Sequence, residues 1–184
     1  VWEGEKLTKE TAFLTSGIKT VYWLQQFPTI FKQMMAEAHG MYLNTNEHLR
    51  ANTEVETRED RFIKQVKQDY PAHQVHKSAP IMHKIRSIKE AVELELMQRA
   101  CKITEAGVRR LLAFIKPGVW EYEIEAELAH EFLRNRSKGF AYTPIVASGK
   151  NACVLHYIEN NQQCQDGDVI LLDVGAEYAN YSSN

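Results

Sequence analysis

Residues 169–175 read VILLDVG, an apolar run that ends in an aspartate and then a glycine. This composition predicts a buried strand that carries the carboxylate of Asp173 to its end. A buried carboxylate is costly unless a cation, a metal or hydrogen bonds compensate its charge. Asp173 therefore needs a partner at a functional site or, in the simpler alternative, caps the following turn through the local backbone.

A second informative stretch, LHYIEN, lies at residues 155–160. The pattern over residues 152–157 predicts another strand, in which His156 and Glu159 would point to opposite faces. A single histidine is more often structural than catalytic. The chain has seven histidines, and none of them forms an HExxH motif or another metal-ligand spacing on a helix. The residues alone therefore leave the role of His156 open.

Composition and charge exclude several classes of protein. The chain has 184 residues, of which 44% are hydrophobic, and this is enough for a packed core. Its 22 basic and 24 acidic residues give a formal net charge of -2, without a long block of like charge. No stretch approaches the roughly 18 apolar residues of a membrane span. We therefore expect a globular protein that binds neither nucleic acid nor membrane.

The cysteines and the start of the chain give two further expectations. Cys101, Cys153 and Cys164 are odd in number and lack CxxC spacing, which favours a reducing compartment, and we predict the cytoplasm. Cys153 has no nucleophile signature around it, so we expect a small core residue. The chain begins at Val1 rather than Met and carries no signal-peptide pattern, so we expect a piece of a longer protein.

The pattern of apolar residues predicts two domains that meet near residues 77–87. The first part is predicted to be α/β, and the second, from residue 81, to be α+β. In the first part we expect strands at 20–24 and 40–43 and helices at 30–38 and 58–70. In the second part we expect helices at 88–111 and 121–136, strands at 142–147, 152–157, 169–174 and 177–181, and a turn at 166–168.

Three stretches together closely resemble the catalytic domain of aminopeptidase P, the Xaa-Pro aminopeptidase of the pita-bread metallopeptidase family. They are NACVLHYIEN at residues 151–160, DGD at 166–168 and LLDVGAEY at 171–178. Other segments look like the start of the family's first helix, the connection to its second helix, and a hairpin late in its N-terminal domain. These segments are IRSIK at 85–89, KPGVWEYEI at 116–124 and WEGE at 2–5.

The resemblance covers most of the chain and implies its architecture. Residues 1–80 would be the C-terminal part of a creatinase-like N-terminal domain with α/β structure. Residues 81–184 would be the first half of an α+β pita-bread (creatinase/aminopeptidase-like) catalytic domain, incomplete at its C-terminus.

The resemblance also implies a chemistry. Family members bind two divalent metals, usually Mn²⁺, through two Asp, one His and two Glu, and hydrolyse peptides with proline at the second position. A hydroxide that bridges the metals would attack the scissile carbonyl, and oxygen ligands suit manganese. Asp173 corresponds to the first Asp ligand, and the second falls eleven residues later, at Asn184. His156 corresponds to a histidine that orients the substrate, whereas the other three ligands would lie beyond residue 184.

Two residues depart from the family pattern. Trp120 stands where the second helix of the family often has a Ser or Thr cap. Asn184 offers a neutral amide, a much poorer metal ligand than a carboxylate, so we expect this chain alone to be inactive and not to hold two metals.

Three functions remain open at this point. One is a metal-dependent Xaa-Pro aminopeptidase in the intact protein, which Asp173 and His156 favour. The others, which Asn184 favours, are a non-catalytic pita-bread module that binds peptides or proteins such as histones, and creatinase-like hydrolysis without metal. The sequence does not decide whether subunits form a homo-oligomer.

Overall fold

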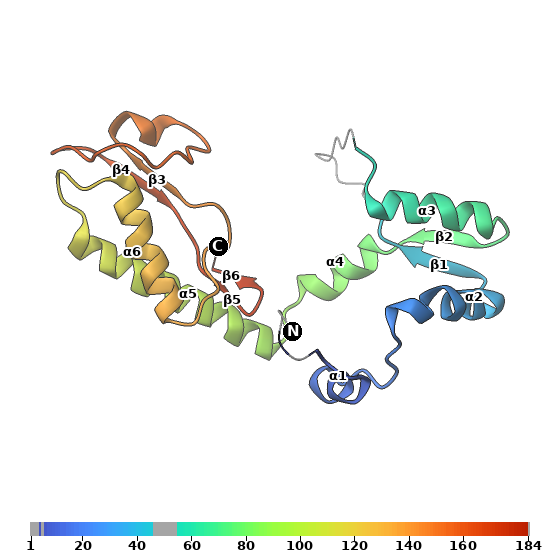
Figure 1. Cartoon of the computed structure of the whole chain (residues 1–184). Helices are drawn as coiled ribbons and strands as arrows, with labels where there is room; N and C mark the ends of the chain where they lie inside the picture. The colour runs from blue at the N-terminus through green and yellow to red at the C-terminus, as the bar shows by residue number, and fades with distance from the viewer. Residues whose placement is uncertain (1–3, 5, 46–54, 184) are drawn as a thin grey trace. The chain divides into compact units, whose positions relative to one another are not determined.

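The computed structural model describes residue 4 and residues 6–45 and 55–183 (Figure 1). The chain divides into two compact units, Val1–Arg86 and Ser87–Asn184, which we describe separately. Most of the hairpin expected at residues 2–5 lies outside the described residues, and so does Asn184.

The first unit combines helices with a pair of parallel strands. Its elements are α1 (Lys9–Ser16), the 3₁₀ helix η1 (Leu24–Gln26), α2 (Phe27–Glu37), β1 (Gly40–Leu43), α3 (Arg58–Asp69), β2 (Gln74–Lys77) and α4 (Ala79–Ser87). Strands β1 and β2 pair in parallel, with Gly40 opposite Gln74 and Leu43 opposite Lys77. The parallel pair and the helix between its strands confirm α/β structure in this part.

Helices α2 and α3 meet through aromatic rings. Phe31 of α2 lies 5.6 Å from Phe62 of α3 and 5.8 Å from Tyr70, measured between ring centroids. At the start of α3, Thr57 and Asp60 form a capping box, in which each side chain accepts the other residue's backbone N–H. Local capping and ring packing thus fix the helix that the sequence pattern predicted.

Most predictions for the first unit are confirmed, and the exceptions have physical reasons. The strand at 40–43 and both helices are present, but the strand expected at 20–24 is wrong. Its Trp23 and Leu24 are exposed, and no strand in the described ranges pairs with this segment. Helix α4 was not predicted; its second residue is Pro80, and proline is well tolerated in the first turn of a helix.

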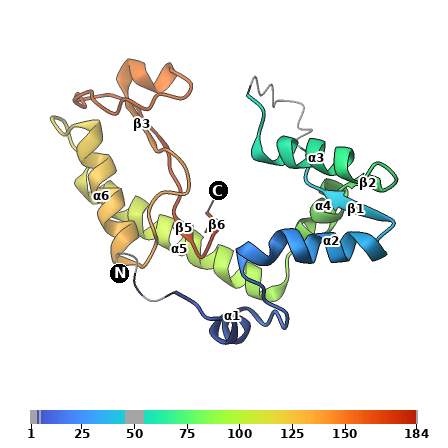
Figure 2. The ribbon, with the colours of Figure 1, turned by 45° about the vertical axis from the view of Figure 1, so that its right-hand side comes forward.

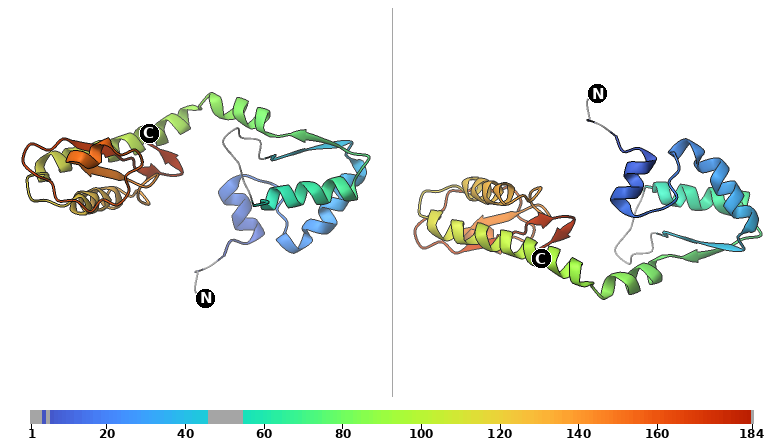
Figure 3. Two further views of the ribbon diagram at one scale, coloured as in Figure 1. Left: turned by 90° about the horizontal axis from the view of Figure 1, so that it is seen from above. Right: turned by 90° about the horizontal axis from the view of Figure 1, so that it is seen from below.

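The second unit packs two helices against antiparallel strands. Its elements are α5 (Ala91–Phe114), α6 (Glu121–Arg134), β3 (Ile145–Ser148), the 3₁₀ helix η2 (Gly149–Cys153), β4 (Ile170–Asp173), β5 (Glu177–Tyr178) and β6 (Tyr181–Ser182). Helices α5 and α6 run side by side, as Figures 2 and 3 show. Strand β3 pairs with β4, so that Ile145 lies opposite Asp173 and Ser148 opposite Ile170.

One hydrophobic core joins these helices and strands. Its buried side chains include Ile103 and Leu111 from α5, Ile124, Leu128 and Phe132 from α6, and Val146 from β3. The helices approach closely at Gly107, where a Cβ atom would lie 2.8 Å from the Phe132 ring. A larger residue there would push the helices apart, so the glycine is required by packing.

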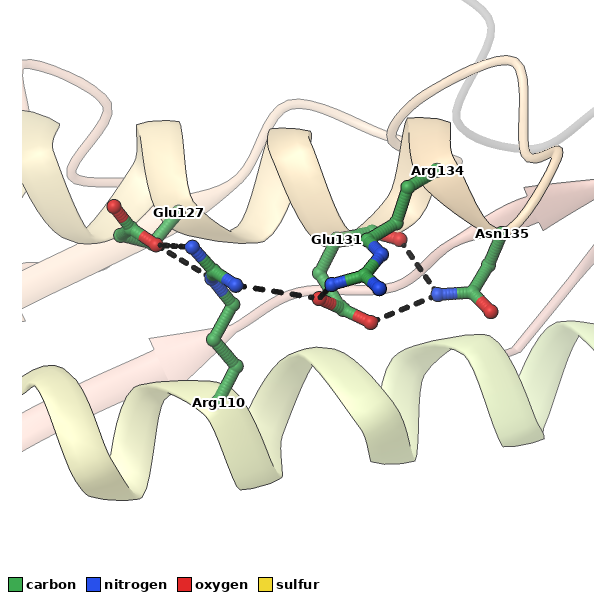
Figure 4. A network of polar contacts seen from close by, with 5 residues as sticks. All are labelled: Arg110, Glu127, Glu131, Arg134 and Asn135. Carbon is green, nitrogen blue, oxygen red and sulfur yellow. Dashed lines mark hydrogen bonds and ion pairs between the residues drawn. The ribbon is translucent and has the colours of Figure 1, made fainter.

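A network of polar side chains connects α5 to α6 (Figure 4). Arg110 of α5 donates to Glu127 of α6 at 2.5 Å and lies 3.6 Å from Glu131. Glu131 also pairs with Arg134 and accepts a hydrogen bond from the amide of Asn135. This network adds polar contacts between the helices outside the apolar core.

The second unit confirms the expected α+β class but corrects two strands. Strands at 142–147 and 169–174 and the turn at 166–168 are present with slightly different bounds. Residues 152–157 are not a strand, because they form the end of η2 and a loop. Residues 177–181 are split between β5 and β6 by a turn with positive φ at Ala179 and Asn180.

Among the described residues, no helix is both long and apolar enough to cross a membrane.

Candidate active site

The structure brings His156 and Asp173 together. Both residues line a pocket of about 330 Å³ in the second unit, although 16 residues separate them in the sequence. The other lining residues are Ile145, Ala152, Cys153, Val154, Leu155, Leu171 and Leu172. Two polar side chains with acid–base or ligand chemistry thus share a pocket whose remaining walls are mainly apolar, which is a common arrangement of a binding site.

Asp173 is the last residue of β4, as predicted, but it is exposed and not buried. The strand itself alternates between half-buried and exposed residues, and the pocket opens at its end. The Tyr142 hydroxyl interacts with the carboxylate of Asp173. Burial of Tyr142, together with the nearby carboxylate of Asp173, raises the pKa of Tyr142 to about 12. The Tyr142 hydroxyl therefore stays protonated beside the carboxylate.

The chain after Asp173 is held against helix α5. The backbone N–H of Ala176 donates to the hydroxyls of Thr104 in α5 and Ser183, at 2.9 and 3.0 Å. A Cβ at Gly175 would lie 3.0 Å from the Ser183 hydroxyl and 3.1 Å from the Tyr142 ring. The glycine of the VILLDVG stretch thus allows Tyr142 to approach the strand and reach Asp173.

His156 lies in a loop, so its predicted placement on one face of a strand was wrong. Its φ is +56°, in the left-handed region, and its side chain is exposed. The next residue, Tyr157, is buried, and Asn160, four residues after His156, is also buried with a φ of +44°. Non-glycine residues adopt this backbone region only when their surroundings impose it.

Helix α6 supplies the contacts that fix this loop. The Tyr157 hydroxyl donates to Glu121 at 2.7 Å, and the amide of Asn160 donates to Glu125 at 2.8 Å. The side-chain oxygen of Asn160 also accepts the backbone N–H of Val146 in β3 at 3.0 Å. Polar anchors on the residues that follow the histidine thus replace the strand that the pattern predicted.

Glu121 is the centre of this polar structure. It is fully buried, and its carboxylate accepts hydrogen bonds from the backbone and hydroxyl of Ser148 and from the backbone of Gln162. Burial raises the pKa of Glu121, but these donors and the Tyr157 hydroxyl outweigh it, so the net pKa is lowered. Glu121 is therefore an ionised carboxylate held by hydrogen bonds.

The sequence offered only a partial signal for this residue. Acidic residues near the start of α6 complement the helix dipole, and this pattern does not separate a fully buried acid from its half-buried neighbours. The spacing of Glu121 and Glu125 by four residues, which places them on one helical face, was the available signal. Glu123 has another role, because it accepts the backbone N–H of Trp120 at 2.8 Å and so caps the helix without a Ser or Thr.

Cys153 is not the core residue that we expected. It is exposed and lines the pocket, because η2 ends there and the loop that follows runs over the surface. Cys164 is the buried cysteine, and burial raises the pKa of its thiol.

Asp173 is suited to bind a divalent cation through its carboxylate oxygens. Within residues 4, 6–45 and 55–183, however, no group of three or more His, Cys, Asp or Glu side chains is arranged to hold a metal ion. The described residues therefore supply one carboxylate that fits a metal and not a complete two-metal centre.

Comparison with known proteins identifies the type of domain. Residues 95–184 match metallopeptidase family M24. The whole chain aligns with the Xaa-Pro aminopeptidase of Haemophilus influenzae at 31% identity, covering 40% of that protein. It also aligns over its whole length with the Escherichia coli Xaa-Pro aminopeptidase at 30% identity, covering 42% of it.

Solved structures agree with this result. A proposed aminopeptidase P from Bacillus anthracis matches with a TM-score of 0.91 and 33% identity, over 99% of this chain and 43% of that one. Aminopeptidase P from Escherichia coli matches with a TM-score of 0.85 and 27% identity, over 98% of this chain and 41% of that one. The chain thus spans about 40% of the length of these relatives, and it carries a metallopeptidase family M24 domain with the pita-bread fold of aminopeptidase P.

Proposed function

We propose that the intact protein is an Xaa-Pro aminopeptidase, a metal-dependent hydrolase that releases the N-terminal residue before proline. The observation that carries this proposal is the shared pocket of His156 and Asp173 within an M24 domain. Relatives that align with the whole chain are named Xaa-Pro aminopeptidase, which supports the same substrate class.

Asp173 is proposed as a metal ligand. Its carboxylate is exposed at the end of β4, close to the neutral Tyr142, and its lone pairs are available to a cation. Oxygen ligands favour hard divalent ions, and we propose Mn²⁺ as the ion of the intact enzyme. Asn184 is proposed to lie at the position of the second Asp ligand, where its amide would bind more weakly.

His156 is proposed to orient the substrate and to stabilise charge on the scissile carbonyl. His156 lines the same pocket as Asp173 but is carried by a separate loop, so both side chains can contact one bound peptide. The apolar side chains of Val154, Leu155 and Leu171 line the same pocket. They provide a surface that suits the hydrocarbon ring of a proline at the second position of a peptide.

The domain bounds, the cellular location, the partners and the oligomeric state are also proposals or predictions. We propose that residues 1–80 form the end of a creatinase-like N-terminal domain and residues 81–184 the first half of the catalytic domain. A cytoplasmic location remains a prediction from the cysteine pattern. The absence of nucleic-acid and membrane partners remains a prediction from the charge and the lack of a long apolar stretch. Homo-oligomer formation remains an open alternative.

A non-catalytic pita-bread module that binds peptides or proteins is the second candidate. The observation that favours it is Asn184, which replaces a carboxylate at a proposed ligand position. The two candidates differ in whether the intact protein binds metal and hydrolyses Xaa-Pro peptides.

The test uses the intact protein, Mn²⁺ and a peptide with proline at the second position. Asp173→Ala should remove bound metal and activity together, because it deletes a ligand. His156→Ala should lower turnover by about 10²-fold or more, the usual size of one oriented catalytic group, with the metal content unchanged. Metal content is measured by elemental analysis and turnover by release of the first residue.

Two matched variants serve as controls. Asp166→Ala removes an exposed carboxylate from a turn, and His130→Ala removes an exposed imidazole from α6. Both should keep metal and activity. Full metal occupancy in Asp173→Ala would refute the ligand role, and an intact protein that binds peptide without cleaving it would favour the non-catalytic module.

The 184-residue chain gives a separate test. Because only Asp173 among the described residues is assigned as a ligand, we expect calorimetric titration with Mn²⁺ to show no tight two-site binding. Tight binding of two metal ions per chain would show that Asn184 and other groups complete the site.

A further inference from the structure

The segment that carries His156 is attached at both ends to one buried carboxylate. Glu121 Oε1 accepts the backbone N–H and the hydroxyl of Ser148, at 2.6 and 3.0 Å, at the end of β3. Glu121 Oε2 accepts the backbone N–H of Gln162 at 2.8 Å. Residues 148–162, which include His156, therefore start and finish on the same side chain.

The same carboxylate also reaches the neighbour of the histidine. Oε2 of Glu121 accepts the Tyr157 hydroxyl at 2.7 Å, and the Tyr157 ring is buried. Burial and the Glu121 bond raise the pKa of Tyr157, so its hydroxyl remains protonated and donates. Because residue 157 follows His156 directly, fixing its ring limits the backbone rotations available to the histidine.

The backbone of His156 requires such a restraint. Its φ of +56° is unfavourable for a residue with a Cβ atom, and its exposed side chain can offer little packing to hold it. Asn160 holds the far side of the loop through Val146 and Glu125, at 3.0 and 2.8 Å. The conformation at His156 thus depends on polar anchors on the residues that follow it.

We propose that Glu121, acting through Tyr157, is a positioning residue that sets the orientation of the His156 imidazole in the active-site pocket. Glu121 does not touch the substrate in this proposal. Burying a carboxylate without a cation carries a desolvation penalty, which an apolar residue of similar size would avoid. The donors that the structure places around Glu121 instead all belong to residues 148–162, the segment that presents His156.

The proposal rests on the proposed function, because it assumes that His156 acts on substrate. Its test therefore has one arm that needs catalysis and one that does not. The central variant is Tyr157→Phe, which keeps the buried ring and removes only the hydroxyl that reaches Glu121. Tyr122→Phe is the matched control, since Tyr122 lies on the same helix as Glu121 but is exposed and stacks on Trp120.

In the catalytic arm, the intact protein with Mn²⁺ cleaves an Xaa-Pro peptide. Tyr157→Phe should lower kcat/KM about tenfold, the effect of one hydrogen bond to a charged group, with unchanged metal content. In a His156→Ala background, the same change should have little further effect, because the residue that it positions is gone. A full tenfold loss in both backgrounds would overturn the proposal, and so would full activity in Tyr157→Phe.

In the second arm, the NMR signal of the His156 imidazole is followed in intact protein with labelled histidine, and His156→Ala assigns it. Tyr157→Phe should shift or broaden this signal, and Tyr122→Phe should leave it unchanged. A His156 signal that is identical in all these proteins would refute the positioning role. If the wild-type protein does not cleave the peptide, the proposed function fails, and this arm still decides the proposal.

Glu121→Gln is a second variant for the same test. It keeps the size of the side chain but replaces one acceptor oxygen with an amide that faces donors. It should perturb the His156 signal at least as strongly as Tyr157→Phe. An unchanged signal in folded Glu121→Gln, with folding checked by circular dichroism, would also count against the proposal.

Discussion

Asp173 and His156 line one pocket, but the segments that carry them are held by different interactions. Strand β4 packs Ile170 and Leu172 against the hydrophobic core and pairs with β3 through regular backbone hydrogen bonds. The loop at 154–162 is held by the buried polar side chains of Glu121 and Asn160. One side of the site thus depends on apolar packing and the other on a polar network.

This difference predicts different responses to substitution and to pH. Apolar packing is insensitive to pH and is spread over many contacts, so its loss lowers the stability of the whole unit. A buried polar network depends on complete pairing, because each donor left without an acceptor adds a desolvation cost. Substitutions can therefore separate the two sides of the site.

The largest expected effect comes from the apolar side. Phe132 is fully buried, packs at Gly107 and meets Phe140 edge-to-face with ring centroids 5.1 Å apart. Phe132→Ala should lower the free energy of unfolding by about 3–5 kcal/mol, because it leaves a cavity between α5 and α6. Urea denaturation measures this loss, and Leu133→Ala, at an exposed position of the same helix, should cost far less. Equal losses would contradict the assigned core.

The sequence predicted the apolar side of the site well, and the reason is visible in β4. Its run of apolar residues predicted a strand with Asp173 at its end, although β4 has half-buried and exposed residues and no fully buried one. The sequence did not predict that Asp173 is exposed. Other elements cover only one face of β4, and a run of apolar residues does not show which face is covered.

The loop side could not be predicted from periodicity. The apolar residues at 154–158 look like a strand, yet Leu155 is 89% exposed and Tyr157 is buried through a hydroxyl contact with Glu121. Periodicity measures apolar burial and carries no signal for hydrogen bonds between residues 36 positions apart. The proposed role of His156 came instead from the resemblance to aminopeptidase P.

The second prediction concerns the polar side. Glu121→Gln should lower the free energy of unfolding by about 2–3 kcal/mol, because an amide cannot satisfy the donors that converge on the carboxylate. Urea denaturation near neutral pH measures this change. Glu105→Gln, which alters an exposed ion pair with Arg109 on α5, should change stability by less than about 1 kcal/mol. A small effect of Glu121→Gln would mean that the network tolerates a missing acceptor.

The pH dependence of stability gives a third, smaller effect. The pKa of Glu121 is lowered from the usual 4.5, so the folded state holds the ionised form more strongly than the unfolded state does. This contribution is complete above pH 4.5 and is lost as the pH falls through the folded pKa. Wild-type protein should therefore lose stability more steeply below pH 4.5 than Glu121→Gln does. Parallel acid curves for the two proteins would show that Glu121 does not contribute.

The smallest expected effect comes from a polar network that is not buried, and it tests whether burial explains the larger effect of Glu121→Gln. Arg110 joins Glu127 and Glu131 on α6, the helix that also carries Glu121, but this network is partly open to solvent (Figure 4). Arg110→Met keeps much of the side-chain length and should cost about 1 kcal/mol or less. Salt screens such pairs, so the difference from wild type should shrink in 1 M NaCl, whereas that of Glu121→Gln should persist. If high salt reduced both differences equally, the buried position of Glu121 would not explain its larger effect.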